Sequence, residues 1–125
     1  MTLQDLQKQI MDEIAALHAC LDAYDEALQA YAVKDHAYRK AQARSLIEHG
    51  TVVAGAKKPT DEMLRAYRDR DCELPMYEQR IAEANKDGLK ARIAAHSTSV
   101  SALQSMLRVH QSEMDMEKYG QRAGA

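Results

Sequence analysis

Hydrophobic residues recur at alternating spacings of three and four along two long stretches of the chain. This spacing lines side chains up along one side of an α-helix. The N-terminal repeat consists of Ile10, Ile14, Leu17, Leu21, Tyr24, Leu28, Tyr31 and Tyr38, with Asp35 where an apolar residue is due. The C-terminal repeat consists of Leu89, Ile93, His96, Val100, Leu103, Leu107, His110 and Met114. We therefore expect an all-α protein with two long arms and coiled-coil-like seams.

Local signals predict where the first arm begins and ends. Thr2 can cap a helix, and Asp5 follows three residues later, where a carboxylate stabilises the exposed amides. Gly50 is a natural stop, so the first helix should run from about residue 3 to about residue 49. A connection of about residues 50–60 follows, because this stretch contains two Gly and a Pro.

The second arm should be helical over about residues 61–118, and interrupted. Its first turn carries Asp61 and Glu62, where the helix dipole favours acids. Pro75 should kink or end the helix near Leu74, and Gly88 is a second weak point. We expect a tail of residues 119–125 to be frayed, since the apolar repeat has ended by then.

The expected architecture is a single helical domain of residues 1–125, folded as a long hairpin with a bent C-terminal arm. Two long arms have little further material to cover their apolar sides. The exposed part of each seam should therefore pack against the same part of a second copy of the chain. This argument predicts a homo-oligomer, and it assigns the C-terminal repeat from Leu89 to Met114 to self-association.

Composition supports helix over sheet and shows a segregated charge. There is no Trp or Phe, and the net charge is −2. Counted by segment, residues 1–30 carry −5, 31–58 carry +4, 59–88 carry −3, 89–112 carry +3 and 113–125 carry −1. The small net charge excludes a uniformly basic nucleic-acid binder, but two local basic blocks remain.

The two cysteines and the absence of long apolar runs indicate the compartment. Cys20 and Cys72 are too few to form a disulfide framework, and no N-terminal signal peptide is recognisable. No apolar run approaches the roughly 20 residues needed to cross a bilayer. We expect a cytoplasmic protein without a membrane partner.

Residue patterns typical of enzymes, cofactor sites and metal sites are missing from the sequence. His18 and Cys20 lie two apart, so a helix points them in different directions. Asp69, Asp71 and Glu73 alternate with arginines, a pattern typical of a solvated ion-pair face. His96 and His110 fall on the seam, either as partly buried residues with one hydrogen bond or, together with symmetry mates, as a metal site or a pH-sensitive interface between copies. We expect no enzymatic activity, no cofactor and no metal.

The strongest functional signal is a basic block that also contains tyrosines. Cations neutralise phosphates and tyrosines stack on unpaired bases, a combination used by single-strand-binding proteins. The alternative is that the tyrosines belong to the seam and the cations to a solvated flank. The candidate contacts are Lys34, Tyr38, Arg39, Lys40 and Arg44, extended by Lys57 and Lys58 in the connection, with Lys90 and Arg92 as secondary contacts.

The order of these features resembles that of small helical phage recombination proteins, and most of all recombination mediators of the UvsY type. The resemblance covers roughly residues 20–115. Its features, in order, are the basic block, the Gly/Lys connection, TDEMLRA opening the next helix, and SALQSMLRVHQSEM. The family motif LKAR occurs here at residues 89–92, displaced from the matching place at residues 42–44, where only Arg44 is kept. The resemblance implies an all-helical oligomer that binds single-stranded DNA and helps load a recombinase onto strands covered by single-strand-binding protein.

We therefore expect a non-enzymatic mediator of a phage or mobile element, located in the host cytoplasm if phage-encoded. Its partners would be single-stranded DNA, further copies of itself, and a phage or host recombinase with its single-strand-binding protein. Two alternatives remain open. One is a helical inhibitor of a host enzyme whose acidic N-terminal arm mimics DNA, and the other is a purely structural coiled coil.

Overall fold

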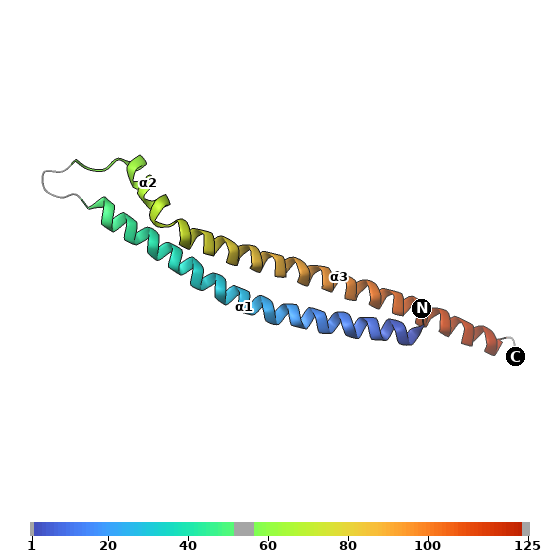
Figure 1. Ribbon diagram of the computed structural model, residues 1–125. Helices are drawn as coiled ribbons and strands as arrows, with labels where there is room; N and C mark the ends of the chain where they lie inside the picture. The colour runs from blue at the N-terminus through green and yellow to red at the C-terminus, as the bar shows by residue number, and fades with distance from the viewer. Residues whose placement is uncertain (1, 52–56, 124–125) are drawn as a thin grey trace. The chain divides into compact units, whose positions relative to one another are not determined.

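The structure is a computed structural model that describes residues 2–51 and 57–123, with side chains except for residues 121–123. It contains three helices, α1 (Leu3–Gly50), α2 (Asp61–Asp71) and α3 (Glu73–Ala123) (Figure 1). No strand occurs among the described residues. The predicted all-α fold with a long helical hairpin is confirmed. No described helix has both the length and the apolar character of a membrane span.

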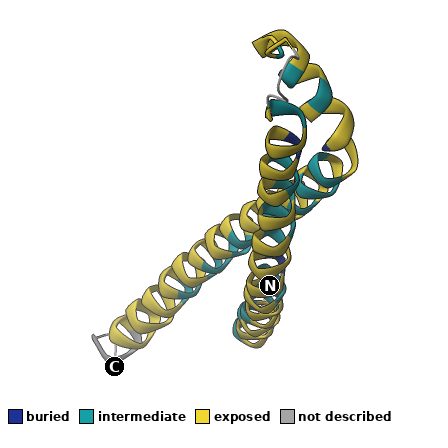
Figure 2. Ribbon diagram, turned by 90° about the vertical axis from the view of Figure 1, so that its left-hand side faces the viewer, coloured by how far each residue is buried: buried dark blue, intermediate teal, exposed yellow. Residues whose placement is uncertain are grey.

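The chain divides into two compact units. Unit 1 comprises Met1–Ala23 with Leu89–Ala125, and unit 2 comprises Tyr24–Gly88. Within each unit a stretch of α1 packs against an antiparallel stretch of α3, and unit 2 also contains α2. Few side chains are fully buried, as the predominance of exposed residues in Figure 2 shows.

The helix starts lie where the sequence predicts them. The Thr2 amide donates to the Asp5 carboxylate at 3.1 Å, and the Asp5 amide donates back to the Thr2 hydroxyl at 3.1 Å. At α2, the Met63 amide donates to the hydroxyl of the N-cap Thr60 at 3.2 Å. Both caps satisfy amides that the first turn of a helix leaves without partners.

The interruption of the C-terminal arm is confirmed, but it lies at Cys72, before the predicted position near Leu74. In a continuous helix the ring of Pro75 would clash with the carbonyl of Asp71, four residues earlier, and α2 ends at Asp71. Pro75 instead occupies the first turn of α3, where its missing amide is not needed. Gly88 does not end the helix, and α3 continues to Ala123, beyond the predicted limit of residue 118.

In unit 1 the C-terminal repeat packs within the chain. Its positions are buried or half-buried from Leu89 to His110, while every residue from Gln111 to Gly120 is exposed. On α1, Leu6 is buried, and the His96 ring forms a hydrogen bond to Glu13 across the unit. The seam that we assigned to self-association is therefore largely covered by the chain's own N-terminal arm.

The register of the α1 seam differs from the predicted one. The positions expected to alternate with Ile10, Leu17 and Tyr24 were Ile14, Leu21 and Leu28. Leu21 and Leu28 are instead 42% and 39% exposed. Ile14 is half-buried as expected, and so is its neighbour Glu13. Cys20 and Ala27 take the places of Leu21 and Leu28, and Lys34, seven residues further on, is half-buried as well. The seam thus contains small and charged residues, and part of the apolar stripe lies at its edge.

Candidate nucleic-acid interface

The cations predicted on α1 in unit 2 fall into paired and unpaired groups. Lys34 Nζ lies 3.1 Å from Glu78 Oε2, and both side chains are partly buried. Arg39 Nε lies 3.0 Å from Asp35 Oδ2, but 77% of the Arg39 side chain is exposed. An exposed pair of this kind is worth little and exchanges readily for another anion. Lys34 is therefore less available to an anion than Arg39 is.

Lys40 and Arg44 are the exposed cations of this helix best placed for phosphate. They lie four residues apart, so both project from the same side of α1. Both are exposed, and no carboxylate of the described residues forms an ion pair with either of them. Their charges are thus available to an anion without breaking an existing contact.

The tyrosines of the block belong to the seam. Tyr31 and Tyr38 are half-buried, and the Lys86 ammonium lies 4.8 Å from the centre of the Tyr31 ring. A half-buried ring offers a nucleotide base less free surface than an exposed ring does. The structure therefore favours the seam interpretation of these two residues over the proposed stacking role of Tyr38.

Two lysines extend the positive surface beyond the end of α1. Lys57 and Lys58 are both exposed. They line a hollow of about 460 Å³ with residues from the end of α1 and the start of α2, among them Glu48, Pro59 and Met63. The sequence placed them in the connection, and the structure brings them beside the α1 terminus.

Two arginines of α2 add to this surface and were not predicted as contacts. Arg65 and Arg68 line a second hollow of about 360 Å³ together with Gln42 and Leu46 of α1. Asp61 lies in the same hollow and offsets part of their charge. Their spacing of three residues places them on one side of α2, a signal present in the sequence. What the sequence did not show was which helix this side faces.

The secondary candidates Lys90 and Arg92 lie in unit 1, on α3. Both are exposed, at the edges of the seam formed by Leu89 and Ile93. They remain accessible to an anion, and their role as contacts stays a prediction.

The predicted oligomerisation residues have a role within one chain. Of the C-terminal repeat, Leu89 is buried and Met114 is exposed, and the others are half-buried. His96 Nδ1 lies 2.8 Å from Glu13 Oε2, which gives this polar seam residue a partner. His110 is half-buried at the end of the seam. Self-association through these residues stays a prediction, while their apolar character is already explained by packing inside unit 1.

A polar network joins the end of α1 to α2 in unit 2. Asp71 accepts hydrogen bonds from the buried Ser45 hydroxyl at 3.0 Å and from Arg70 Nε at 3.2 Å, and its Oδ2 lies 2.9 Å from His49 Nε2. The His49 ring stacks on Tyr67, with centroids 4.0 Å apart. These contacts attach α2 to α1 and position Arg65 and Arg68, which lie on the same short helix.

The network changes the acidity of two side chains. Burial alone would raise the pKa of Asp71, but the hydrogen bonds from Ser45, Arg70 and His49 outweigh it and lower this pKa below its ordinary value of 3.8. Burial, and then the negative charge of Asp71, raise the pKa of the Cys72 thiol above 9.0. Asp71 is thus held as a carboxylate and Cys72 as a neutral thiol.

Comparison of the chain with protein-family models, curated proteins and solved structures found no match. A nucleic-acid interface is therefore inferred from the geometry of this chain alone. That geometry is a group of exposed cations around the α1–α2 end of unit 2, held in place by the Asp71 network.

Proposed function

We propose that this protein is a non-enzymatic single-stranded-DNA-binding protein that contacts phosphates through the exposed cations of unit 2. The observation that carries the proposal is the pair Lys40 and Arg44, exposed on one side of α1 and without a carboxylate partner among the described residues. Lys57 and Lys58 follow at the end of the helix, and Arg65 and Arg68 line the adjoining hollow.

The charge of this region favours a polyanion. Residues 39–70 contain eight Lys and Arg against four Asp and Glu, a surplus of four positive charges in a chain whose net charge is −2. Cations of this kind neutralise phosphates and release counterions, which gives affinity without sequence specificity. The same surplus also attracts a DNA strand from a distance at low salt.

Base stacking is better served by a tyrosine other than Tyr38. Tyr38 is half-buried, whereas Tyr77 of α3, also in unit 2, is 62% exposed. It lines a shallow surface together with Leu74 and Arg80. An exposed ring beside an arginine can hold an unpaired base by stacking, which is a reason to prefer single-stranded over duplex DNA.

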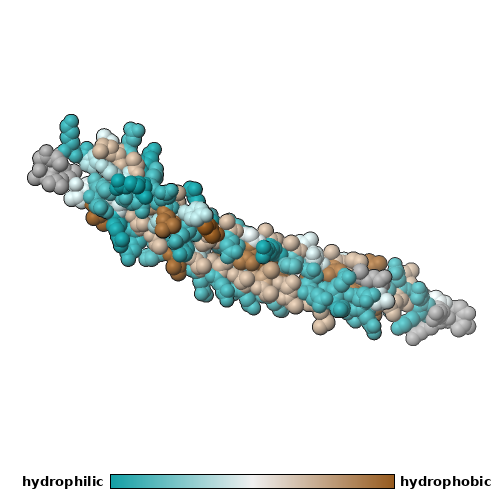
Figure 3. Space-filling model, in the orientation of Figure 1, coloured by the Kyte–Doolittle hydropathy of each residue, from teal (hydrophilic) through white to brown (hydrophobic). Residues whose placement is uncertain are grey.

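The proposed biological role is that of a recombination mediator acting as a homo-oligomer. It is supported by the resemblance to phage mediators and by exposed apolar side chains, including Met11 and Leu21 in unit 1. Figure 3 shows hydrophobic side chains interspersed with hydrophilic ones on the face it draws. Several modest basic patches on one oligomer would act together on a long strand. A recombinase and its single-strand-binding protein would be the protein partners.

Fluorescence anisotropy with a labelled oligonucleotide tests the DNA proposal. The double variant Lys40→Ala/Arg44→Ala should weaken binding about tenfold at low salt, because two phosphate contacts are lost. The matched control Lys8→Ala/Lys118→Ala removes two exposed cations outside unit 2 and should leave binding within about twofold. Equal losses in both variants would show a general charge effect and overturn the assigned site.

An inhibitor that mimics DNA is the second candidate, favoured by one observation. Asp12, Asp22, Asp25 and Glu26 are all exposed along α1. Regularly exposed acids on a helix can occupy a basic nucleic-acid channel of another protein. The anisotropy titration separates the two candidates, because a DNA mimic has no affinity for the oligonucleotide at any salt concentration.

A further inference from the structure

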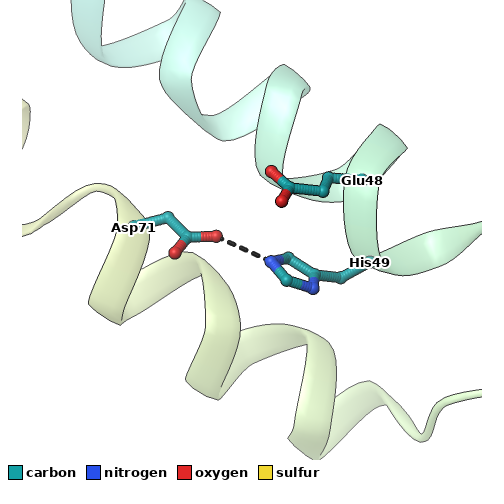
Figure 4. A group of neighbouring side chains, drawn as sticks. All are labelled: Glu48, His49 and Asp71. Atoms are coloured by element: carbon teal, nitrogen blue, oxygen red, sulfur yellow. Dashed lines mark hydrogen bonds and ion pairs between the residues drawn. The ribbon is translucent and has the colours of Figure 1, made fainter.

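We propose that Glu48, His49 and Asp71 form a binding site for a divalent transition-metal ion such as Zn²⁺, which bridges α1 and α2. One ligand atom from each residue lies within 4.8 Å of the others. Figure 4 shows Glu48 and His49 extending from the last turns of α1 toward Asp71 on α2. All three residues belong to unit 2, and none of them is among the DNA contacts proposed above.

Two of the three ligands are already close to the separation that a shared ion requires. His49 Nε2 and Asp71 Oδ2 are 2.9 Å apart. At a Zn–N distance of about 2.05 Å and a Zn–O distance of about 2.1 Å, two tetrahedral ligands lie about 3.4 Å apart. The pair has to open by about 0.5 Å for the ion to take the place of the shared proton.

The surroundings hold these two ligands in position. The His49 ring is stacked on Tyr67, and the side chains of His49 and Asp71 are only 18% and 28% exposed. The buried Ser45 hydroxyl donates to Asp71 Oδ2, and Arg70 donates to the other oxygen, Oδ1. Hydrogen bonds that orient a ligating carboxylate are a regular part of metal sites.

The donor set and the local charge select the kind of ion. One imidazole nitrogen and two carboxylate oxygens suit Zn²⁺, whereas Mg²⁺ prefers oxygen ligands alone and gives up its water reluctantly. Lys57 and Lys58 line the same hollow as Glu48 and His49, and their charges oppose the binding of a cation. A site without a strong nitrogen ligand would therefore not hold one. Three protein ligands leave the fourth tetrahedral position to water.

Thermal unfolding of the full chain with added ZnCl₂, in the absence of DNA, tests the site. We expect one Zn²⁺ per chain and a rise in Tm of about 10 °C at hundredfold excess over Kd, with no rise for MgCl₂. His49→Gln should abolish the rise, and Glu48→Gln, which alters an exposed side chain, should weaken Zn²⁺ binding about tenfold. The control His36→Gln changes an exposed histidine of the same helix and should leave the rise intact.

Substitution with Co²⁺ identifies the ligands directly. The proposal expects a spectrum of nitrogen and oxygen ligands without a thiolate charge-transfer band, because neither Cys20 nor Cys72 belongs to the site. A thiolate band, an unchanged Zn²⁺ effect in His49→Gln, or the absence of any Zn²⁺-induced rise in Tm would overturn the proposal. Each readout compares a variant with and without metal, so a variant of lower basal stability remains informative.

Discussion

His96 Nδ1 of α3 lies 2.8 Å from Glu13 Oε2 of α1, a contact between residues 83 positions apart in the sequence. Both residues occupy seam positions in unit 1, and both side chains are about one-third exposed, at 30% and 33%. The contact shows that the C-terminal repeat packs against the N-terminal arm of its own chain. It also explains why two polar residues, His96 and Glu13, occupy seam positions, since each is the hydrogen-bond partner of the other.

Removing either partner of this contact should destabilise the protein moderately. His96→Ala or Glu13→Ala should each lower the free energy of unfolding by about 1 kcal/mol, since the hydrogen bond is partly exposed to water. A double-mutant cycle by urea unfolding should give a coupling of about 0.5–1 kcal/mol. The control His18→Ala changes an exposed histidine of α1 and should have an effect below about 0.5 kcal/mol. A coupling near zero would show that the contact contributes nothing in solution.

Leu89 tests whether the C-terminal seam packs within one chain. Leu89→Ala should lower the free energy of unfolding by about 2–4 kcal/mol, because removing this buried side chain leaves a cavity. The same substitution at the exposed Leu74 should cost less than about 0.5 kcal/mol. The loss of unfolding free energy in Leu89→Ala should be equal at low and high protein concentration. A loss that grows on dilution would instead place this residue in an interface between copies.

Stability should fall in acid through Asp71. Its folded-state pKa is lowered, so its contribution to stability is complete above the ordinary value of 3.8 and is lost as the pH falls through the lowered folded-state value. The difference in unfolding free energy between wild type and Asp71→Asn should therefore be largest at neutral pH and shrink below about pH 3.8. Denaturant titrations in a chelating buffer measure this difference without metal.

Asp69→Asn is the matched control for this experiment. It removes the same charge from an exposed position of α2, where Asp69 lies 3.9 Å from Arg68. Its effect on unfolding should be small at every pH. A pH-dependent loss as large for Asp69→Asn as for Asp71→Asn would mean that the network around Asp71 is not the cause.

The two cysteines should differ in reactivity. Cys72 is 2% exposed and its thiol pKa is raised by burial and by Asp71, so little thiolate forms and reagents have no access. Alkylation at pH 8, followed by mass spectrometry, should modify Cys72 roughly tenfold or more slowly in the folded than in the urea-unfolded protein. The half-buried Cys20 should be protected less. Equal protection of both thiols would contradict the buried position of Cys72.

Local chemistry made the helix limits largely predictable from sequence. The cap at Thr2 and the stop at Gly50 depend on a few neighbouring residues, and both lie where expected. The Thr60 cap agrees with the predicted helix start at residue 61. The break near Pro75 was predicted, but its position follows from the clash of the proline ring with the carbonyl four residues earlier. That argument moves the break to Cys72, and it could have been made from the sequence.

The seam register and the Asp71 network were not predictable in the same way. Leu21 and Leu28 compete with Cys20 and Ala27 for neighbouring positions, and hydrophobicity alone favours the leucines, while Glu13 and Ile14 are both half-buried. Glu13 belongs in the seam because His96 lies opposite, which the sequence of one helix does not reveal. Likewise, the sequence around Asp71 predicts an exposed ion-pair face. Only the fold shows that Ser45 and His49 of α1 lie beside this carboxylate.

The salt dependence of oligonucleotide binding tests the proposed DNA interface most directly. With four to six phosphates contacted by the exposed cations of unit 2, log K for wild type should fall with log salt concentration at a slope of about −3 to −4. Lys40→Ala/Arg44→Ala should reduce the magnitude of this slope by about 1.4, and Lys8→Ala/Lys118→Ala should leave it unchanged. A wild-type protein that binds no oligonucleotide at low salt, or binds it with a slope near zero, would contradict the proposed function.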